Sequence, residues 1–158
     1  MTKKNVVLAS AAALGLAASF AAGVAIAKSA ATKPELTAFS ELQWTPLMKE
    51  GPLPAFAPIE GDAMKGAYLG YLKLPAGFES PPHSHTSDYW AVLIQGQMTH
   101  WAADGGSEKD SKAIGLGGWT HMPGKVAHIS KCYPGAECIM VIMQKGKNDF
   151  IPASPMKK

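Results

Sequence analysis

The most informative part of the sequence runs from Gly77 to Gly96 and reads GFESPPHSHTSDYWAVLIQG. It holds two histidines separated by one residue, His83 and His85, directly after a pair of prolines. Residues two apart on a β-strand point to the same face, so both imidazoles are expected to project into one space. The prolines restrict the backbone just before this strand. The pattern is typical of a β-scaffold that supplies two metal ligands from one strand.

The rest of the chain favours short strands separated by turns. Runs of strand-forming residues end at glycine- or proline-containing turns, at intervals typical of all-β sandwiches and barrels. We find no useful helical period, internal repeat or low-complexity tract after the N-terminal segment. The expected strands cover residues 67–74, 83–94, 97–102 and 119–122, followed by a hairpin of 126–133 and 138–144.

Two histidine motifs resemble those of the cupin superfamily. The first family motif is a glycine, five residues, His-x-His, three or four residues, a glutamate, six residues and a glycine. The corresponding positions here are Gly77, His83, His85, Tyr89 in place of the glutamate, and Gly96.

The second family motif is a glycine, five residues, a proline, one residue, a glycine, two residues and a histidine. Here Gly117, Pro123 and His128 match it, while Lys125 stands where the second glycine is expected and Gly124 is shifted by one. The resemblance covers roughly residues 65–145, with the small single-domain cupins as its nearest group.

This resemblance implies an all-β fold, an antiparallel double-stranded β-helix (the cupin or jelly-roll barrel), with a short N-terminal extension. It also implies that His83, His85 and His128 are metal ligands. Three neutral imidazoles suit several divalent transition metals. We expect iron first, with zinc, nickel, manganese and copper as alternatives.

Two further residues are candidate catalytic groups. Tyr89 shares the parity of His83 and His85, so on a regular strand its hydroxyl faces inward, either to hold a metal-bound water or to pack. His121 matches no motif position and is a candidate acid–base group, as is His100. The alternative is that each of these two histidines is an ordinary, partly buried residue.

The N-terminal segment is predicted to be a secretory signal peptide spanning residues 1–27. Lys3 and Lys4 precede an uncharged run rich in alanine, valine and leucine, which ends in a small-x-small cleavage signal at Ala25-Ile26-Ala27. An uncleaved membrane anchor is the alternative. The remaining boundaries are an extension and loop over 28–64, the barrel over 65–150 and a tail over 151–158. The mature protein is therefore expected to be periplasmic or secreted, without stable membrane insertion.

Charge and cysteine usage limit the partners. The formal net charge of +3 becomes +1 once the two leader lysines are removed, which does not favour nucleic-acid binding. All basic residues are lysine, so the chain has no guanidinium group, which binds carboxylates and phosphates through two parallel hydrogen bonds. A strongly anionic ligand held in that way is therefore not expected. Cys132 and Cys138 flank a Pro-Gly turn and are expected to form a disulfide after export, with buried thiols or a soft copper-type site as alternatives.

Three functional hypotheses follow. The first is a metal-dependent dioxygenase acting on a small organic molecule, since an open three-histidine site can bind both substrate and dioxygen. The second is a non-catalytic cupin that binds a small ligand or a metal. The third is a metal-dependent isomerase or lyase, with Tyr89 or His121 as its base. A homodimer is expected by analogy with other cupins.

Overall fold

The computed structural model describes residues 33–49 and 54–153 of the chain. The predicted signal peptide and the last five residues lie outside the described residues. Every strand belongs to one compact unit that begins at Thr37.

Strands dominate this unit, and only two short 3-10 helices accompany them. Neither helix within the described residues is long and apolar enough to cross a membrane. In chain order the elements are η1 (Phe39–Glu41), β1 (Thr45–Pro46), β2 (Ala55–Gly61), β3 (Tyr68–Leu74), β4 (His83–Ser84), β5 (Tyr89–Gln95), β6 (Met98–Ala102), η2 (Glu108–Asp110), β7 (Trp119–Met122), β8 (His128–Cys132), β9 (Cys138–Gln144) and β10 (Ile151–Pro152).

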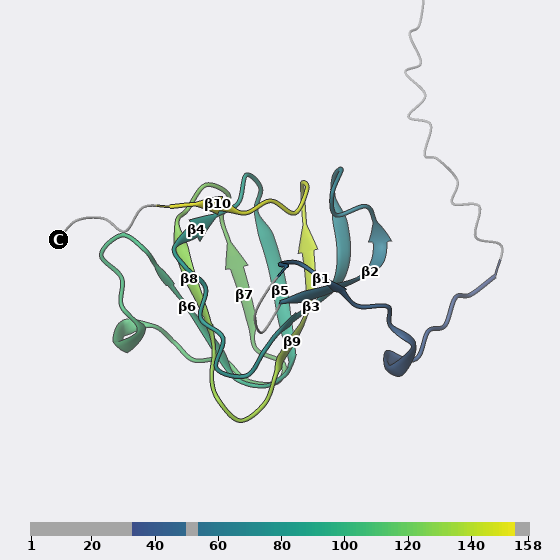
Figure 1. Cartoon of the computed structure of the whole chain (residues 1–158), viewed down its shortest axis with the longest axis horizontal. Coiled ribbons are helices and arrows are strands. Elements are labelled where there is room, and N and C mark those ends of the chain that lie inside the picture. Colours follow the sequence, from purple (N-terminus) through teal and green to yellow (C-terminus); the bar gives the residue numbers. More distant parts are fainter. Residues whose placement is uncertain (1–32, 50–53, 154–158) are drawn as a thin grey trace, which may run out of the picture. The chain divides into compact units, whose positions relative to one another are not determined.

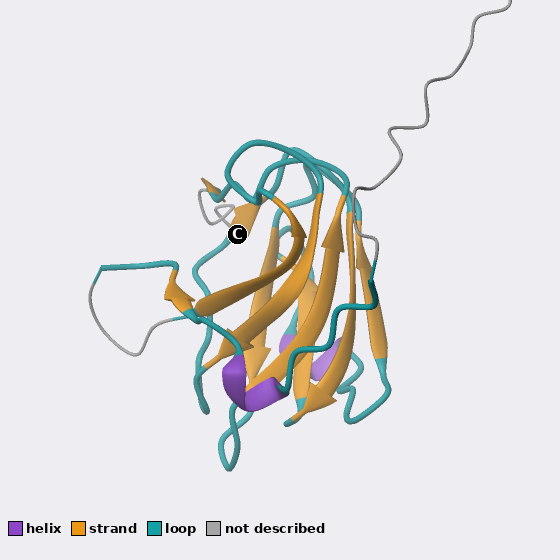
Figure 2. Ribbon diagram, turned by 90° about the vertical axis from the view of Figure 1, so that its right-hand side faces the viewer, coloured by secondary structure: helices purple, strands orange, loops and turns teal. Residues whose placement is uncertain are grey.

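The strands form two antiparallel sheets. One sheet has six strands in the order β1-β2-β3-β9-β5-β7, and the other has four in the order β10-β4-β8-β6. Figure 1 shows β4, β8 and β6 on the left, the strands of the larger sheet to their right, and β10 across the top. In Figure 2 the strands run side by side along the wall of the barrel, and the two short helices lie at its lower end. The predicted all-β antiparallel architecture is confirmed.

The core fills the space between the sheets, because alternate side chains of each strand point inward. In β9, Met140 and Ile142 are 2 % and 5 % exposed, whereas Met143 on the outer face is 49 % exposed. Leu93 of β5 and Met98 of β6 are 1 % exposed and belong to the same cluster.

The structure assigns more of the chain to the sheets than the sequence predicts. Residues 55–61, which fall in the predicted extension and loop over 28–64, form β2, and residues 151–152, which fall in the predicted tail, form β10. Pro58 is accommodated because the pairing register shifts between Pro58 and Glu60, and because β1 pairs only with the start of β2. The sheets therefore extend beyond the predicted limits of 65 and 150.

The predicted strand over 83–94 is in fact two strands in different sheets. β4 pairs with β8 and β10, whereas β5 pairs with β7 and β9. Residues 85–88 connect β4 to β5, so the chain passes from the smaller sheet to the larger one at this point. Consequently Tyr89 faces inward because of the orientation of β5 and not because it continues the strand of His83.

The hairpin between β8 and β9 carries the predicted disulfide, which joins Cys132 and Cys138 with their Cα atoms 5.7 Å apart. Both cysteines are fully buried in the core. Gly96 lies against this hairpin at φ +84°, and a Cβ there would come within 2.6 Å of Glu137 O. This position therefore accepts only glycine, which explains the glycine that ends the first histidine motif.

Candidate metal centre

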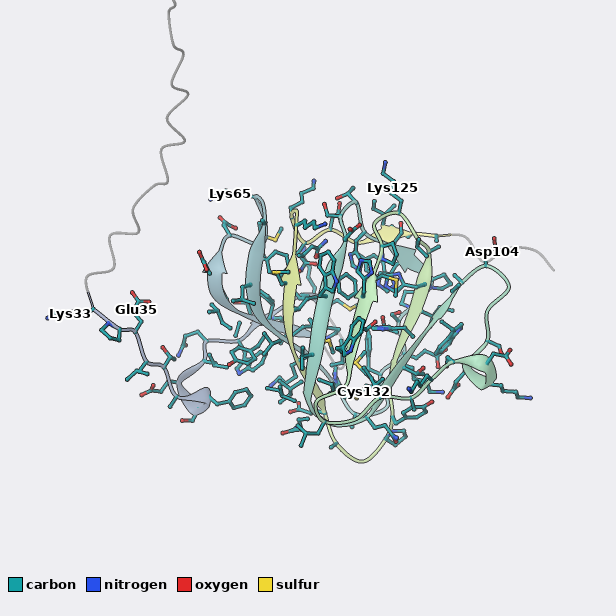
Figure 3. All side chains as sticks on the ribbon, turned by 180° about the vertical axis from the view of Figure 1, so that it is seen from behind. Lys33, Glu35, Lys65, Asp104, Lys125 and Cys132 are labelled. Carbon is teal, nitrogen blue, oxygen red and sulfur yellow. A yellow bond between two sulfur atoms is a disulfide. The ribbon has the colours of Figure 1, made fainter. Side chains whose placement is uncertain are left out.

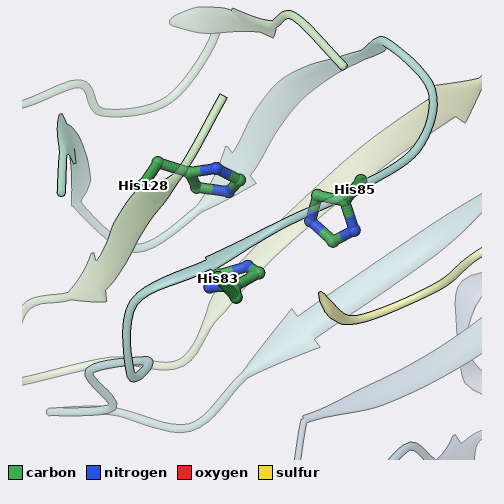
Figure 4. Close-up of side chains that lie close together, drawn as sticks. All are labelled: His83, His85 and His128. Atoms are coloured by element: carbon green, nitrogen blue, oxygen red, sulfur yellow. The ribbon is translucent and has the colours of Figure 1, made fainter. Parts of the chain in front are cut away.

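The three motif histidines come together between the two sheets. His83 lies in β4 directly opposite His128 of β8, and His85 follows β4 by one residue. The ring centroids of His83 and His128 are 4.3 Å apart, and those of His83 and His85 are 5.0 Å apart. One ligand nitrogen from each ring lies within 4.8 Å of the others (Figure 4). The structure thus forms a compact three-nitrogen group from the residues that the motifs single out.

Backbone carbonyls set the tautomer of all three imidazoles. His83 Nδ1 lies 2.9 Å from Pro81 O, His128 Nδ1 lies 3.0 Å from Val126 O, and His85 Nδ1 bonds to Asp149 O. A carbonyl oxygen can only accept, so each Nδ1 carries the hydrogen and donates it. Each Nε2 therefore keeps a free lone pair, which is the arrangement that a metal-binding imidazole requires.

Burial keeps these histidines uncharged. Loss of solvent lowers the pKa of His83 to about 4 and that of His128 to about 3, and it also lowers the pKa of His85. The neighbouring imidazoles add to the shift of His83 and His128, because a second positive charge nearby is unfavourable. At neutral pH a metal ion therefore does not have to displace protons from the ligand nitrogens.

The segment around Asp149 supports the histidines. Thr86 donates its backbone N–H to Asp149 Oδ1 at 3.0 Å and its hydroxyl to Asp149 Oδ2 at 2.7 Å. This pairing fixes the carbonyl that accepts the His85 hydrogen bond. Phe150 stacks on His83 with ring centroids 4.4 Å apart. The sequence did not indicate Asp149 or Phe150 as part of the site, because no motif or spacing marks either residue.

Tyr89 occupies the place of the motif glutamate and faces the site, as predicted, although it lies in another strand than His83. It is 5 % exposed, and its hydroxyl lies 3.5 Å from His128 Nε2. Burial raises the pKa of Tyr89 above its ordinary value, so the phenol stays protonated and can donate a hydrogen bond. The residue therefore provides a neutral donor at the position where the motif has a glutamate.

The structure does not bring His121 to this group. His121 stacks on Trp90 with ring centroids 4.5 Å apart and faces Asp88 on the outer side of β7. Its neighbour Thr120 points inward and lies 3.3 Å from His100 Nδ1, so strand alternation directs His121 away from the interior. His121 therefore lies outside the histidine group, and its position does not support the predicted catalytic role.

His100 is the histidine that does reach the site. Its ring centroid is 5.8 Å from that of His128 and 6.5 Å from that of Tyr89. Burial, together with the imidazoles of His83 and His85, lowers the pKa of His100 to about 4. The sequence offered one signal for it, since His100 shares the strand parity of Met98, a core residue.

A loop with an unusual backbone supports the same end of the barrel. Lys125 is the one non-glycine residue of the described chain with a positive φ, at 67°, and it stands where the motif has glycine. Its N–H donates to His85 O at 2.6 Å. A left-handed backbone, which glycine adopts most easily, is thus formed by a lysine at the position where the motif has glycine.

A cavity of about 420 Å³ opens onto the histidines. His83, His85, Tyr89 and His100 line one part of it, and aliphatic, aromatic and methionine side chains line most of the rest. The donor set next to the cavity is three neutral imidazoles, which fits iron, zinc, nickel or copper. The residues present therefore fit a divalent transition metal beside a space for a small molecule.

Comparisons with known proteins agree with this fold. No protein-family model matches the sequence, and a search of curated proteins finds no match. Among solved structures, the polyketide cyclase RemF from Streptomyces resistomycificus aligns with a TM-score of 0.59 and 14 % identity, over 77 % of this chain and 87 % of RemF.

Two other solved structures give similar values. KdgF from Halomonas sp. aligns with a TM-score of 0.54 and 14 % identity, over 74 % of this chain and 97 % of its own. An RmlC-like cupin from Ralstonia eutropha aligns with a TM-score of 0.54 and 19 % identity, over 72 % and 69 %. The chain therefore has the cupin fold. At these identities the similarity establishes the fold and leaves the activity to be argued from the site.

Proposed function

We propose that this chain is an exported cupin that binds one divalent transition metal through His83, His85 and His128. The observation that carries the proposal is the shared tautomer of the three rings. Each Nδ1 is bonded to a backbone carbonyl, so three Nε2 lone pairs are left within one small space. Iron is the metal that we expect first, because imidazoles suit it and a dioxygenase reaction requires redox chemistry.

We propose further that the bound metal serves a dioxygenase reaction on a small organic molecule. When bound, the metal would supply Lewis-acid chemistry and, if it is iron, redox chemistry. Three histidines without a carboxylate ligand leave coordination positions open, and the cavity lined by His83 and His85 gives a substrate access to them. Tyr89 would donate a hydrogen bond from its protonated hydroxyl to an oxygen atom placed there.

A non-catalytic binding protein is the second candidate. It is favoured by the largely apolar surroundings, since neither of the two candidate acid–base groups among the described residues that line the cavity, Tyr89 and His100, is poised as a base at neutral pH. The pKa of Tyr89 is raised and that of His100 is lowered, so neither accepts a proton readily. For the same reason, an isomerase or lyase has less support, because His121, its other candidate base, lies on the outer face.

Export is supported by the disulfide between Cys132 and Cys138, since such bonds persist mainly in oxidising compartments. The leader-like N-terminal segment points the same way. Mass spectrometry of the protein recovered from a periplasmic fraction would test this, with an N-terminus at Lys28 as the expected result.

The metal content of the purified mature protein is the decisive measurement. We expect close to one equivalent of metal in the protein purified without chelator, and none in a His83→Ala, His128→Ala double variant. His121→Ala is the matched control, because it removes a histidine from the outer face and should leave the metal in place. If the wild type carries no more metal than the double variant after reconstitution, the proposed metal site is wrong.

Oxygen consumption then separates the two functions. The iron-loaded protein is screened with thiols, diketones and phenols in an oxygen-electrode assay. Uptake that requires both iron and an organic substrate would support the dioxygenase. Stoichiometric ligand binding without any oxygen uptake across the panel would instead favour the non-catalytic binding protein.

A further inference from the structure

The two sheets change from polar to apolar in the same direction along their strands. The inward side chains of β9 run from Gln144 through Ile142 and Met140 to Cys138. Those of β8 run from His128 through Ser130 to Cys132. Because the hairpin joins β8 to β9 at the disulfide, Gln144 and His128 lie together at the other end. Figure 3 shows Cys132 near the lower end of the barrel and Lys125, three residues before His128, at the upper end.

Neighbouring strands repeat the same gradient. In the larger sheet, Gln144 is paired with Tyr68 on one side and Tyr89 on the other, which makes a polar row. Four residues back along β9, Met140 lies between Leu72 and Leu93, which makes an apolar row.

In the smaller sheet, His128 pairs with His83 at one end, and Cys132 pairs with Met98 at the other. The interior is therefore polar at the histidine end and hydrocarbon-like toward the disulfide.

Most polar atoms at the histidine end already have partners. The Tyr68 hydroxyl donates to Gln144 Oε1 at 2.7 Å, and Gln144 Nε2 donates to Lys147 O at 3.2 Å. Ser80 Oγ accepts from the backbone N–H of Ser130. The polar groups that face a ligand at this end include the imidazoles of His83, His85 and His100, the hydroxyl of Tyr89 and the side-chain amide of Asn148, all of which line the cavity.

The cavity offers no partner for a charge at its apolar end. Among the described residues that line it, Asp149 is the only one with an ionisable carboxylate, and its two oxygens accept hydrogen bonds from Thr86. No lysine lines the cavity in this part of the chain, and the chain contains no arginine. A charged group placed between Leu72, Met98 and Met140 would be desolvated without compensation.

We propose that the cavity takes a small amphipathic molecule with one oxygen-bearing end and an uncharged hydrocarbon body, aromatic or alicyclic. Its hydroxyl or carbonyl end lies against the histidines and Tyr89, and its body lies between Leu72, Met98 and Met140. The assignment deepens the proposed function, since it names the ligand class of the same site. Sugars, sugar acids and phosphate esters are excluded because they carry polar or charged groups along their whole length.

The volume sets the size of this ligand. A cavity of about 420 Å³ is near the lower end of the range for small-molecule sites. At the packing density of protein interiors, about 0.75, it would be filled by a molecule of roughly 15 to 20 non-hydrogen atoms. Two linked or fused six-membered rings with one or two small substituents meet this limit.

Three related probes test the assignment: 4-phenylphenol, 4′-hydroxybiphenyl-4-carboxylate, and the methyl ester of that acid. All three share the hydroxyl end and the two rings, and the ester matches the acid in size without its charge. We expect calorimetry on the metal-free protein to show that 4-phenylphenol and the ester bind about tenfold or more tightly than the acid. Equal or tighter binding of the acid would overturn the proposal.

Methionine methyl signals locate the probe. In protein with ¹³C-labelled methionine methyls, 4-phenylphenol should shift the signals of Met98 and Met140, which line the cavity, and not that of Met143 on the outer face. Met140→Leu and Met143→Leu are volume-conserving variants that assign the two signals of β9. If the probe shifts Met143 and leaves Met98 and Met140 unchanged, the cavity is not the binding site and the proposal fails.

This experiment separates the two proposals because it uses metal-free protein and measures binding alone. If the probes follow the expected order while the metal measurement finds no metal site, the metal proposal fails and the ligand class stands. If the protein holds one equivalent of metal but the acid binds best, the metal centre stands and the ligand class is wrong.

Discussion

The ring of Phe150 lies flat on the ring of His83, with centroids 4.4 Å apart and planes 11° from parallel. His83 is 5 % exposed and Phe150 is 51 % exposed, so the phenyl ring covers the imidazole from the solvent side. The imidazole of His83, a proposed metal ligand, is thus oriented in two ways. Phe150 packs on its ring face, and Pro81 O accepts a hydrogen bond from Nδ1 at its ring edge.

Removal of this ring should weaken metal binding more than it weakens the fold. Groups that support metal ligands typically contribute 10- to 100-fold to metal affinity, so we expect Phe150→Ala to lower zinc affinity by about tenfold. Chelator competition measures the affinity. Ile151→Ala changes the next residue, which is 42 % exposed, and should leave the affinity unchanged. An unaltered zinc affinity in Phe150→Ala would show that the stack does not position His83.

The pairing between Thr86 and Asp149 should be needed for the orientation of His85. Asp149→Ala removes the acceptor of both Thr86 hydrogen bonds and frees the backbone carbonyl that receives His85 Nδ1–H. We expect about a tenfold loss of zinc affinity, with most of it restored in Asp149→Asn, which can still accept from Thr86. Asp62→Ala, which removes an exposed carboxylate elsewhere, is the control. Equal losses in the alanine and asparagine variants would contradict this role.

His100 should make the metal-free protein less stable in acid. Its pKa is about 4 in the folded protein, against about 6.5 in an unfolded chain, so between these values the unfolded state binds more protons. Stability contributed by the neutral ring is complete above pH 6.5 and is lost as the pH falls toward 4. In chelator-treated protein, His100→Gln should reduce the slope of unfolding free energy by up to about 1.4 kcal/mol per pH unit.

Urea denaturation at intervals from pH 8 to pH 4 measures this slope. Above pH 7 the curves of the two proteins are expected to run parallel, because the ring is then neutral in both states. Parallel curves down to pH 4 would contradict the assignment.

Lys125 should tolerate glycine and reject a β-branched residue. Its φ of 67° is in the left-handed region, which costs an L-residue roughly 1–2 kcal/mol and costs glycine almost nothing. Since glycine also gives the unfolded chain more freedom, we expect Lys125→Gly to stabilise the protein by only about 0.5 kcal/mol. Lys125→Val should destabilise it by about 1 kcal/mol or more.

Thermal and urea unfolding of both variants check this, with Lys109→Gly as the control in η2. Lysine 109 has no positive φ, so glycine there should lower stability slightly. If Lys125→Val stabilised the protein, the backbone at Lys125 would not be strained and the prediction would be wrong.

The three proposed ligands could be predicted from local sequence because their spacing is a short-range property. His-x-His on a strand sends two rings to one face, and the second motif places His128 after a turn of defined length. The disulfide was predictable for the same reason, since the cysteines flank one tight turn. The replacement of the motif glutamate by a neutral residue, Tyr89, is likewise evident from the sequence alone.

The other parts of the site depend on contacts between segments far apart in the chain. His85 and Asp149 are 64 residues apart, and Thr86 meets the Asp149 side chain over 63 residues. No periodicity or spacing encodes such pairs, because they form only when β10 adds to β4 and carries the preceding residues over the histidines. Which of His100 and His121 reaches the histidine group likewise depends on the tertiary structure, because it follows from which face of β6 and of β7 is turned toward the interior.

Local patterns along the chain were thus enough to specify the all-β architecture, the histidine group and the cysteine pair, because turn chemistry and strand alternation act over a few residues. Closure of the two sheets specified the rest: the Phe150 stack, the carbonyl that orients His85, and the apolar end of the cavity. These features need side chains from several strands to meet, so they follow from the pairing of the strands and from burial, which no single segment contains.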